Sequence, residues 1–207
     1  MNASEALARL RRLGVPVIAT ADAAAAWKLA TDTTSHALKG LAKAGLIASV
    51  RHGTWWIEGS DPDPYRLPEY LTLPMPSYLS LQTALHLRGL IEQIPHVFYA
   101  VTLARTQRIT TRIGTYSFHH VAPEVFGGFE ETKAGIKLAT AEKALFDFAY
   151  LSGGRSRLFT HLPELELPRG FRRSALARWV AAIPSSRGRT LTERRLADLL
   201  ARASATR

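Results

Sequence analysis

The feature that most constrains this chain is a proline-rich stretch in its first half. Five prolines fall between residues 62 and 76, within GSDPDPYRLPEYLTLPMP. Proline removes a backbone donor and clashes with the preceding helical turn, so no long helix can cross this segment. We therefore expect a domain at 1–58, a linker or extended strap at 59–76, and a second domain at 77–207.

The first 58 residues show the pattern of a winged helix-turn-helix. Apolar residues recur at helical spacing before Gly14 and again before Gly45, and two short β-rich runs flank Arg51-His52-Gly53. Thr20 should cap the second helix, and Asp32 with its neighbouring hydroxyls should cap the third. The expected elements are helices over 4–13, 21–28 and about 31–44, and strands over 46–50 and 54–57.

Residues 77–207 predict a mixed α/β domain, which makes the fold class α+β. Apolar spacing favours a helix over 77–90, and β-branched and aromatic runs between 96 and 121 favour a small antiparallel sheet. A further strand is expected at 136–138 and a helix after Thr140, whose charged residues Glu142, Lys143 and Asp147 are interpreted as structural. Two basic amphipathic helices are expected in the tail from residue 155.

The charge of the chain is uneven. The net charge is +10 overall, −1 over residues 59–154 and +8 over residues 155–207. A strongly basic balance favours polyanions or an acidic partner. We expect the tail arginines to form a second basic surface that either extends along DNA or meets an acidic face of a partner protein. Its members are Arg172, Arg173, Arg178, Arg187, Arg189, Arg194 and Arg195.

The third helix and the hairpin after it are the predicted DNA-binding elements. In this fold the third helix enters the major groove, and the hairpin touches the backbone or the minor groove. With Leu38, Leu41 and Leu46 in the core, hydroxyl, imidazole and amine groups would face outward, where they can bond phosphates or base edges. The predicted contacts are Thr33, Thr34, Ser35, His36, Lys39, Lys43, Arg51 and His52.

Several other functions remain open from the residues alone. Asp61 or Asp63 with Glu131-Thr132-Lys133 imitates a nuclease pattern, but these two acids lie in the proline-rich segment rather than on a shared sheet. His119 and His120 are neighbours on a predicted strand and would diverge, so no metal site is expected. A ligand-sensing second domain and a winged helix that binds protein rather than DNA are further alternatives.

Composition limits the setting in which the chain works. It contains no cysteine, which excludes disulfides and suits a reducing compartment. We find no signal-peptide pattern at the start and no uncharged apolar run of the roughly 18 residues needed to span a bilayer. A cytoplasmic protein without membrane association, cofactor or bound metal is therefore expected.

Four stretches in order resemble the AbiEi antitoxins of type IV toxin–antitoxin systems. They are GLIASVRHGTWWI, PSYLSLQTALHLRGLIEQIP, VTLARTQRITTRIGTYSFHHV and KLATAEKALFDFAYL, and the resemblance spans roughly residues 5–152. It implies a winged-helix protein that represses its own promoter. Such a protein binds inverted repeats in that promoter, either as monomers that bind cooperatively or as a dimer. It also implies an antitoxin, without catalysis of its own, that counters a nucleotidyltransferase-like toxin.

Overall fold

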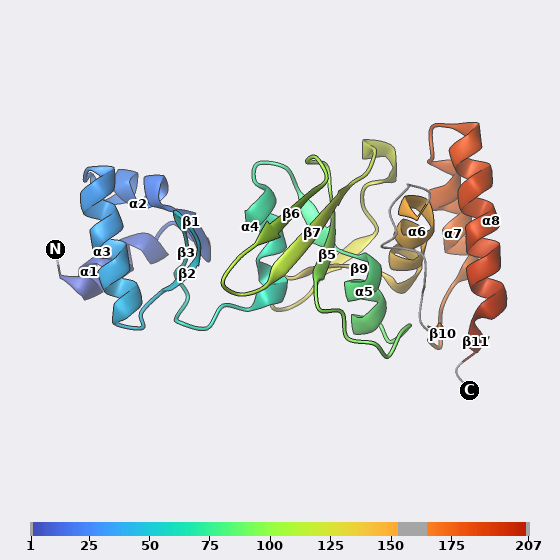
Figure 1. Cartoon of the computed structure of the whole chain (residues 1–207), viewed down its shortest axis with the longest axis horizontal. Helices are drawn as coiled ribbons and strands as arrows, with labels where there is room; N and C mark the ends of the chain where they lie inside the picture. Colours follow the sequence, from blue (N-terminus) through green and yellow to red (C-terminus); the bar gives the residue numbers. More distant parts are fainter. Residues whose placement is uncertain (1, 153–164, 206–207) are drawn as a thin grey trace. The chain divides into compact units, whose positions relative to one another are not determined.

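The computed structural model describes residues 2–152 and 165–205, and its described part is a mixed α+β fold. The chain divides into two compact units. Unit 1 comprises Met1–Tyr70 and Thr110–Gly114, and unit 2 comprises Leu71–Ile109 and Thr115–Arg207. Unit 1 thus takes in residues 59–70 of the segment that the sequence predicts to be a linker. Figure 1 labels the α-helices and most of the strands of both units.

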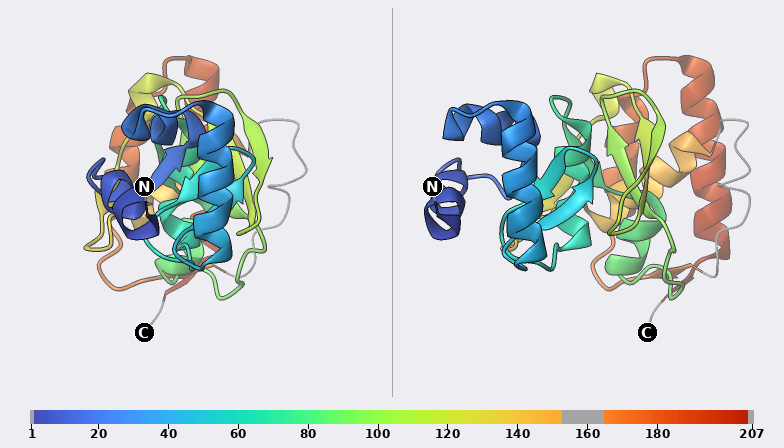
Figure 2. Two further views of the ribbon diagram at one scale, coloured as in Figure 1. Left: turned by 90° about the vertical axis from the view of Figure 1, so that its left-hand side faces the viewer. Right: turned by 60° about the vertical axis from the view of Figure 1, so that its left-hand side comes forward.

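Within residues 2–58, unit 1 forms three α-helices and a three-stranded antiparallel sheet. Its strands lie in the order β1-β3-β2, so β2 is an edge strand. Both views in Figure 2 show α3 beside this sheet. The elements are α1 (Ala3–Arg11), β1 (Val17–Ala19), α2 (Thr20–Trp27), α3 (Thr31–Lys43), β2 (Ala48–Arg51) and β3 (Thr54–Trp56). The three α-helices and the strands β2 and β3 match the expected elements to within a few residues at their ends, whereas the strand β1 was not among the expected elements.

One apolar core joins the three helices of unit 1 to its sheet. Leu10 of α1, Leu38 of α3 and Ile18 of β1 are almost completely buried and pack with Trp55 of β3. Burying a side chain of this size contributes roughly 1.5–3 kcal/mol. The apolar stripe of α3 therefore fixes which of its residues face outward.

The helix starts of unit 1 differ from the capping that the sequence predicts. Ala19 and Ala30 occupy the N-cap positions of α2 and α3, and neither Thr20 nor Asp32 caps its helix. The Thr20 hydroxyl instead accepts a hydrogen bond of 3.0 Å from the Trp55 indole. The Thr20 hydroxyl thus bonds a side chain that is distant in sequence, although the sequence predicted that it would cap α2. The predicted end of α3 is confirmed, because Gly45 has a φ of +70° just after the helix.

The proline-rich segment forms two short helices instead of an extended strap. They are η1 (Pro64–Arg66), a 3₁₀-helix, and α4 (Pro68–Thr72). Each starts with proline, which is tolerated in a first helical turn because the backbone donor there has no helical partner. In unit 1 the guanidinium of Arg66 lies over the Trp56 ring, 5.1 Å from its centroid, and pairs with Glu58. The segment is therefore folded and packed.

Unit 2 contains a six-stranded mixed sheet, so the prediction of a small antiparallel sheet is wrong. The strand order is β6-β7-β5-β4-β9-β8, with β5–β7 and β4–β9 parallel. The strands are β4 (Ser77–Leu79), β5 (Phe98–Thr102), β6 (Gln107–Thr110), β7 (Thr115–His120), β8 (Phe129–Glu131) and β9 (Lys137–Ala139). The helix expected over 77–90 is reduced to α5 (Leu81–Leu87), because residues 77–79 form the fully buried strand β4.

Helices cover one end of unit 2. In Figure 1, α7 (Arg173–Ala181) and α8 (Ser186–Arg202) lie on the side of α6 (Ala141–Leu151) away from the sheet. The predicted cap of α6 is confirmed, since the Thr140 hydroxyl accepts the Lys143 backbone N–H at 3.2 Å. The remaining described elements are the 3₁₀-helix η2 (Pro123–Val125) and the parallel pair β10 (Glu166–Leu167) and β11 (Ser204–Ala205).

Candidate functional site

The outward side of α3 carries a row of polar and cationic side chains. His36, Lys39 and Lys43 are exposed and recur at intervals of three and four residues, which places them on one side of the helix. Thr33 is exposed next to this row and Ser35 is half-buried. Imidazole, amine and hydroxyl groups in such a row can donate to phosphates or base edges.

Thr34 does not belong to this row, so the prediction that it faces outward is wrong. Its side chain is fully buried, on the same side of α3 as Leu38 and Leu41. The hydroxyl has no hydrogen-bond partner among the residues that the structure describes. With a helical repeat of 3.6 residues, the position four before Leu38 faces the core whatever its polarity.

The exposed acid Asp32 was missed by sequence reasoning, which assigned it to a cap. It lies one turn before His36 and on the same side of α3 as Lys39 and Lys43. Its place in the first helical turn is favourable because the helix dipole stabilises an acid there. Helical spacing alone could have placed Asp32 beside the predicted contacts. A carboxylate at this position can accept a hydrogen bond from the amino group of cytosine.

The hairpin after α3 is held at its turn and exposes two polar side chains there. Arg51 and His52 are exposed, and Gly53 takes the left-handed conformation that the turn requires, with a φ of +70°. The Gly53 carbonyl accepts the Thr20 backbone N–H at 2.9 Å. The hairpin turn is thereby tied to the start of α2. We call the exposed set on these elements the α3–hairpin face: Thr33, His36, Lys39, Lys43, Arg51 and His52.

The seven tail arginines differ in how far their side chains are exposed. Arg189 and Arg195 are half-buried and donate to the backbone carbonyls of Ile183 (2.7 Å) and Ala149 (3.5 Å). These two guanidinium groups contact the protein itself, and the second basic surface stays a prediction. The other five are exposed, and Arg187 and Arg194 lie seven residues apart on one side of α8: Arg172, Arg173, Arg178, Arg187 and Arg194.

The most unusual electrostatic feature of unit 2 is a buried charged cluster on α6. Lys143 and Asp147 are both fully buried, one helical turn apart, and form an ion pair. Asp147 also accepts hydrogen bonds from the hydroxyls of Tyr78 (3.0 Å) and Ser80 (2.7 Å). The Lys143 ammonium lies 4.7 Å from the centroid of the Trp179 ring of α7. We call Tyr78, Ser80, Lys143 and Asp147 the buried charged cluster.

Burial is the largest influence on the ionisable groups of this cluster. It lowers the pKa of Lys143 and raises the pKa of Asp147, and each partner's charge opposes the shift of the other. Burial, followed by the charge of Asp147, raises the pKa of Tyr78 well above its usual value. Because both members of the ion pair are fully buried, the cluster holds α6 in the fold and offers no open binding surface. This geometry agrees with the structural role expected for Lys143 and Asp147.

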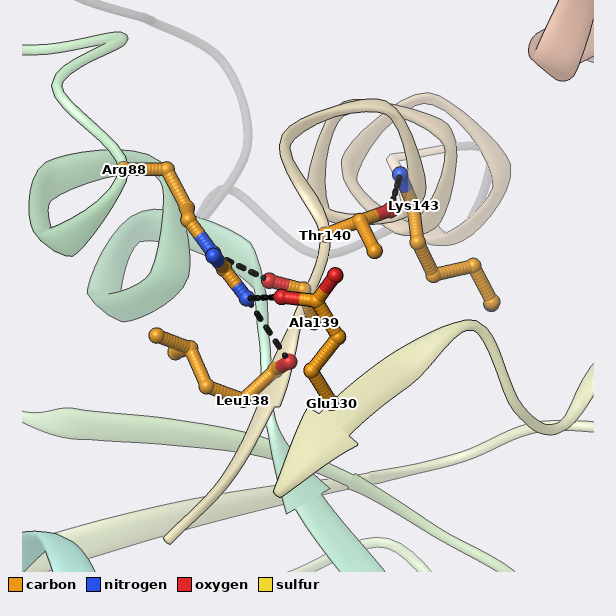
Figure 3. A network of polar contacts seen from close by, with 6 residues as sticks. All are labelled: Arg88, Glu130, Leu138, Ala139, Thr140 and Lys143. Carbon is orange, nitrogen blue, oxygen red and sulfur yellow. Dashed lines mark hydrogen bonds and ion pairs between the residues drawn. The ribbon is translucent and has the colours of Figure 1, made fainter. Parts of the chain in front are cut away.

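A neighbouring polar network fixes the approach of the chain to α6. Figure 3 shows Arg88 reaching from the end of α5 to the end of β9. Its guanidinium donates to the carbonyls of Ala139 (2.9 Å) and Leu138 (3.3 Å) and pairs with Glu130 (2.8 Å). The carbonyls at the end of β9 are thereby satisfied just before the Thr140 cap. This network positions α6 and, with it, the buried charged cluster.

His119 and Asp63, which the metal and nuclease alternatives invoke, each make a local hydrogen bond. His119 is buried and bonded to the Ser117 hydroxyl, whereas His120 is exposed, so the two neighbours diverge as predicted. Burial lowers the pKa of His119. Asp63 accepts the Tyr65 N–H at the start of η1. Within residues 2–152 and 165–205, no group of three or more His, Cys, Asp or Glu side chains is placed to hold a metal ion.

Unit 2 also has an open cavity between its sheet and its C-terminal helices. Its volume is about 510 Å³. Polar groups of His120, Tyr150 and Arg195 line it beside apolar Ile183 and Leu191. Burial raises the pKa of the Tyr150 phenol, so this group stays a hydrogen-bond donor.

Comparison with known proteins adds no family assignment. No protein-family model matches the chain, and no curated protein matches it significantly. The resemblance to AbiEi antitoxins therefore stays a prediction. Among the helices that the structure describes, none has the length and apolar composition to span a membrane.

Proposed function

We propose that the protein is a DNA-binding transcriptional autorepressor whose first domain is a winged helix-turn-helix. The order helix-strand-helix-helix-strand-strand in unit 1 and its β1-β3-β2 sheet support this reading. In this proposal α3 enters the major groove and the hairpin of β2 and β3 touches the DNA backbone.

The observation that carries the proposal is the α3–hairpin face. Its cations, Lys39, Lys43 and Arg51, are exposed on consecutive elements, and none has an ion pair within the described part of the chain. Lysine and arginine side chains that bind phosphates release counterions, so binding should weaken as salt rises. The α3 row has no arginine or asparagine for bidentate base contacts, so sequence preference should depend on two copies that bind an inverted repeat.

The first test is a gel shift of the full chain on its own upstream region, beside a random duplex of equal length, at two salt concentrations. We expect a specific shift that salt weakens. In the double variant Lys39→Gln/Lys43→Gln, the slope of log K against log salt should flatten by about two, since each phosphate that the protein neutralises contributes roughly 0.9 to it. The matched control is Arg202→Gln on α8, which removes an exposed cation far along the chain from α3. Equal binding to both duplexes, or no binding, contradicts the proposal.

The proposal extends to an antitoxin that counters a nucleotidyltransferase-like toxin without catalysis of its own. The five exposed tail arginines support a second surface for DNA or for an acidic face of that toxin. Co-expression with the neighbouring gene tests whether the protein restores growth. The variants Arg187→Gln and Arg194→Gln test whether the second surface contributes to DNA binding or to that rescue. If these variants changed neither DNA affinity nor rescue, the second surface would be rejected.

A ligand-sensing regulator is the second candidate, because unit 2 has the open cavity with Tyr150, His120 and Arg195 at its wall. An arginine beside apolar walls suits a small carboxylate. Addition of benzoate as a probe should then change the operator shift of the wild-type chain and leave that of Arg195→Gln unchanged. A shift that benzoate does not affect favours the antitoxin reading.

A further inference from the structure

The tip of the β6–β7 hairpin is part of unit 1, although it follows the hairpin of β2 and β3 by about sixty residues. The Arg112 backbone N–H donates to the Val50 carbonyl at 2.9 Å. Val50 lies at a register shift in the β2–β3 pairing, between Ser49 and Arg51, where one residue of β2 has no partner opposite it. Such a bulge in an edge strand leaves backbone groups open, and the hairpin tip covers one of them.

The tip has a fixed backbone. The Thr111 hydroxyl donates to the Gly114 carbonyl at 2.9 Å and accepts the backbone N–H groups of Ile113 and Gly114, both at 3.1 Å. The Thr111 N–H also bonds the Gly114 carbonyl, which closes a tip of two residues, Arg112 and Ile113. Ile113 is half-buried and Arg112 is exposed. The Arg112 side chain therefore extends from an ordered backbone that is hydrogen-bonded to Val50, the residue of β2 that precedes Arg51.

We infer that Arg112 is a DNA-contacting residue that completes the wing by binding a backbone phosphate. This inference rests on the proposed function of unit 1. Arg112 forms no ion pair with any residue of 2–152 or 165–205, so its donors are available. A guanidinium matches the geometry of a phosphate and keeps its charge at any physiological pH.

The charge balance of unit 1 makes this one residue important. The unit holds nine Lys and Arg, Arg112 included, against seven Asp and Glu, a net charge of +2. Removing Arg112 halves that net charge. Binding to the sugar–phosphate backbone carries no sequence information, so Arg112 sets affinity and register and leaves base preference to α3.

The test measures the affinity of the full chain for its upstream duplex and for a random duplex by fluorescence anisotropy, between about 50 and 200 mM salt. In Arg112→Gln, the slope of log K against log salt should flatten by about one, and both duplexes should lose affinity by the same factor. The substitution keeps the backbone N–H that bonds Val50, so circular dichroism should match the wild type. Arg112→Lys, which keeps the charge, should retain the wild-type slope.

The matched control is Arg108→Gln, an exposed arginine of β6 in the same hairpin but in unit 2. Its slope should equal that of the wild type. An unchanged slope in Arg112→Gln overturns the inference. An equal flattening of the slope in Arg108→Gln also overturns it, because it would show that the net charge acts at long range rather than through a phosphate contact of Arg112. If the wild type binds neither duplex, the proposed function itself fails and Arg112 with it. If the wild type binds and Arg112→Gln is indistinguishable, only the present inference is lost.

Discussion

The α3–hairpin face of unit 1 and the buried charged cluster of unit 2 both contain lysine, but in opposite surroundings. Lys39 and Lys43 are exposed and have no ion pair in the described structure, whereas Lys143 is fully buried against Asp147. A solvated cation costs the fold little and can gain energy from an external anion. A buried cation must be paired inside the protein, because desolvation costs several kcal/mol for each ion. The same residue type thus serves binding in one region and the fold in the other.

The largest expected effect follows from breaking the buried pair. Lys143→Met leaves the Asp147 carboxylate buried without its cation, and we expect a loss of about 3–5 kcal/mol of unfolding free energy. The double variant Lys143→Met/Asp147→Asn keeps an acceptor for Tyr78 and Ser80 and should recover most of that loss. Urea unfolding measures both. The double variant Lys39→Gln/Lys43→Gln replaces two exposed lysines and should change the unfolding free energy by less than about 0.5 kcal/mol. If Lys39→Gln/Lys43→Gln lost more unfolding free energy than this, the contrast between the exposed and the buried lysines would be contradicted.

A second, smaller effect concerns how α7 packs on the buried charged cluster. Gly128 has a φ of +71°, and a Cβ there would lie 2.5 Å from Cζ2 of Trp179. Gly128→Ala should therefore cost about 2–4 kcal/mol, since both backbone strain and overpacking oppose it. Gly89→Ala is the matched control, because Gly89 has a φ of +73° with no atom within 4 Å of the added carbon. Equal losses of unfolding free energy in the two variants would show that the contact with Trp179 adds nothing to the cost of Gly128→Ala.

The smallest expected effect concerns the one predicted DNA contact that is buried. Thr34→Val removes a buried hydroxyl without a described partner and keeps the shape of the side chain. We expect the unfolding free energy to stay unchanged or to rise by up to about 1 kcal/mol, with DNA affinity unaltered. Thr33→Val, on the exposed side of the same helix turn, is the comparison for affinity. A loss of DNA binding confined to Thr34→Val would mean that this residue reaches DNA after all.

The sequence determined the features that depend on neighbours along the chain. The periodicity of Leu38 and Leu41 gave α3, Gly45 gave its end, and Thr140 gave the start of α6. These features need only a helical repeat, a residue that tolerates a positive φ, or a hydroxyl three residues before an amide. For the same reason the outward row His36, Lys39 and Lys43 could be predicted without a structure.

Only the tertiary structure decided the features whose partners are distant in sequence. Ser77–Leu79 has apolar spacing that fits a helix, yet it becomes a strand because β5 and β9 pair with it on both sides. Arg112 lies beside Val50 because a bulge about sixty residues earlier leaves a carbonyl open. No local pattern encodes such pairings, since they depend on which distant backbone groups remain unsatisfied once the rest of the chain has folded.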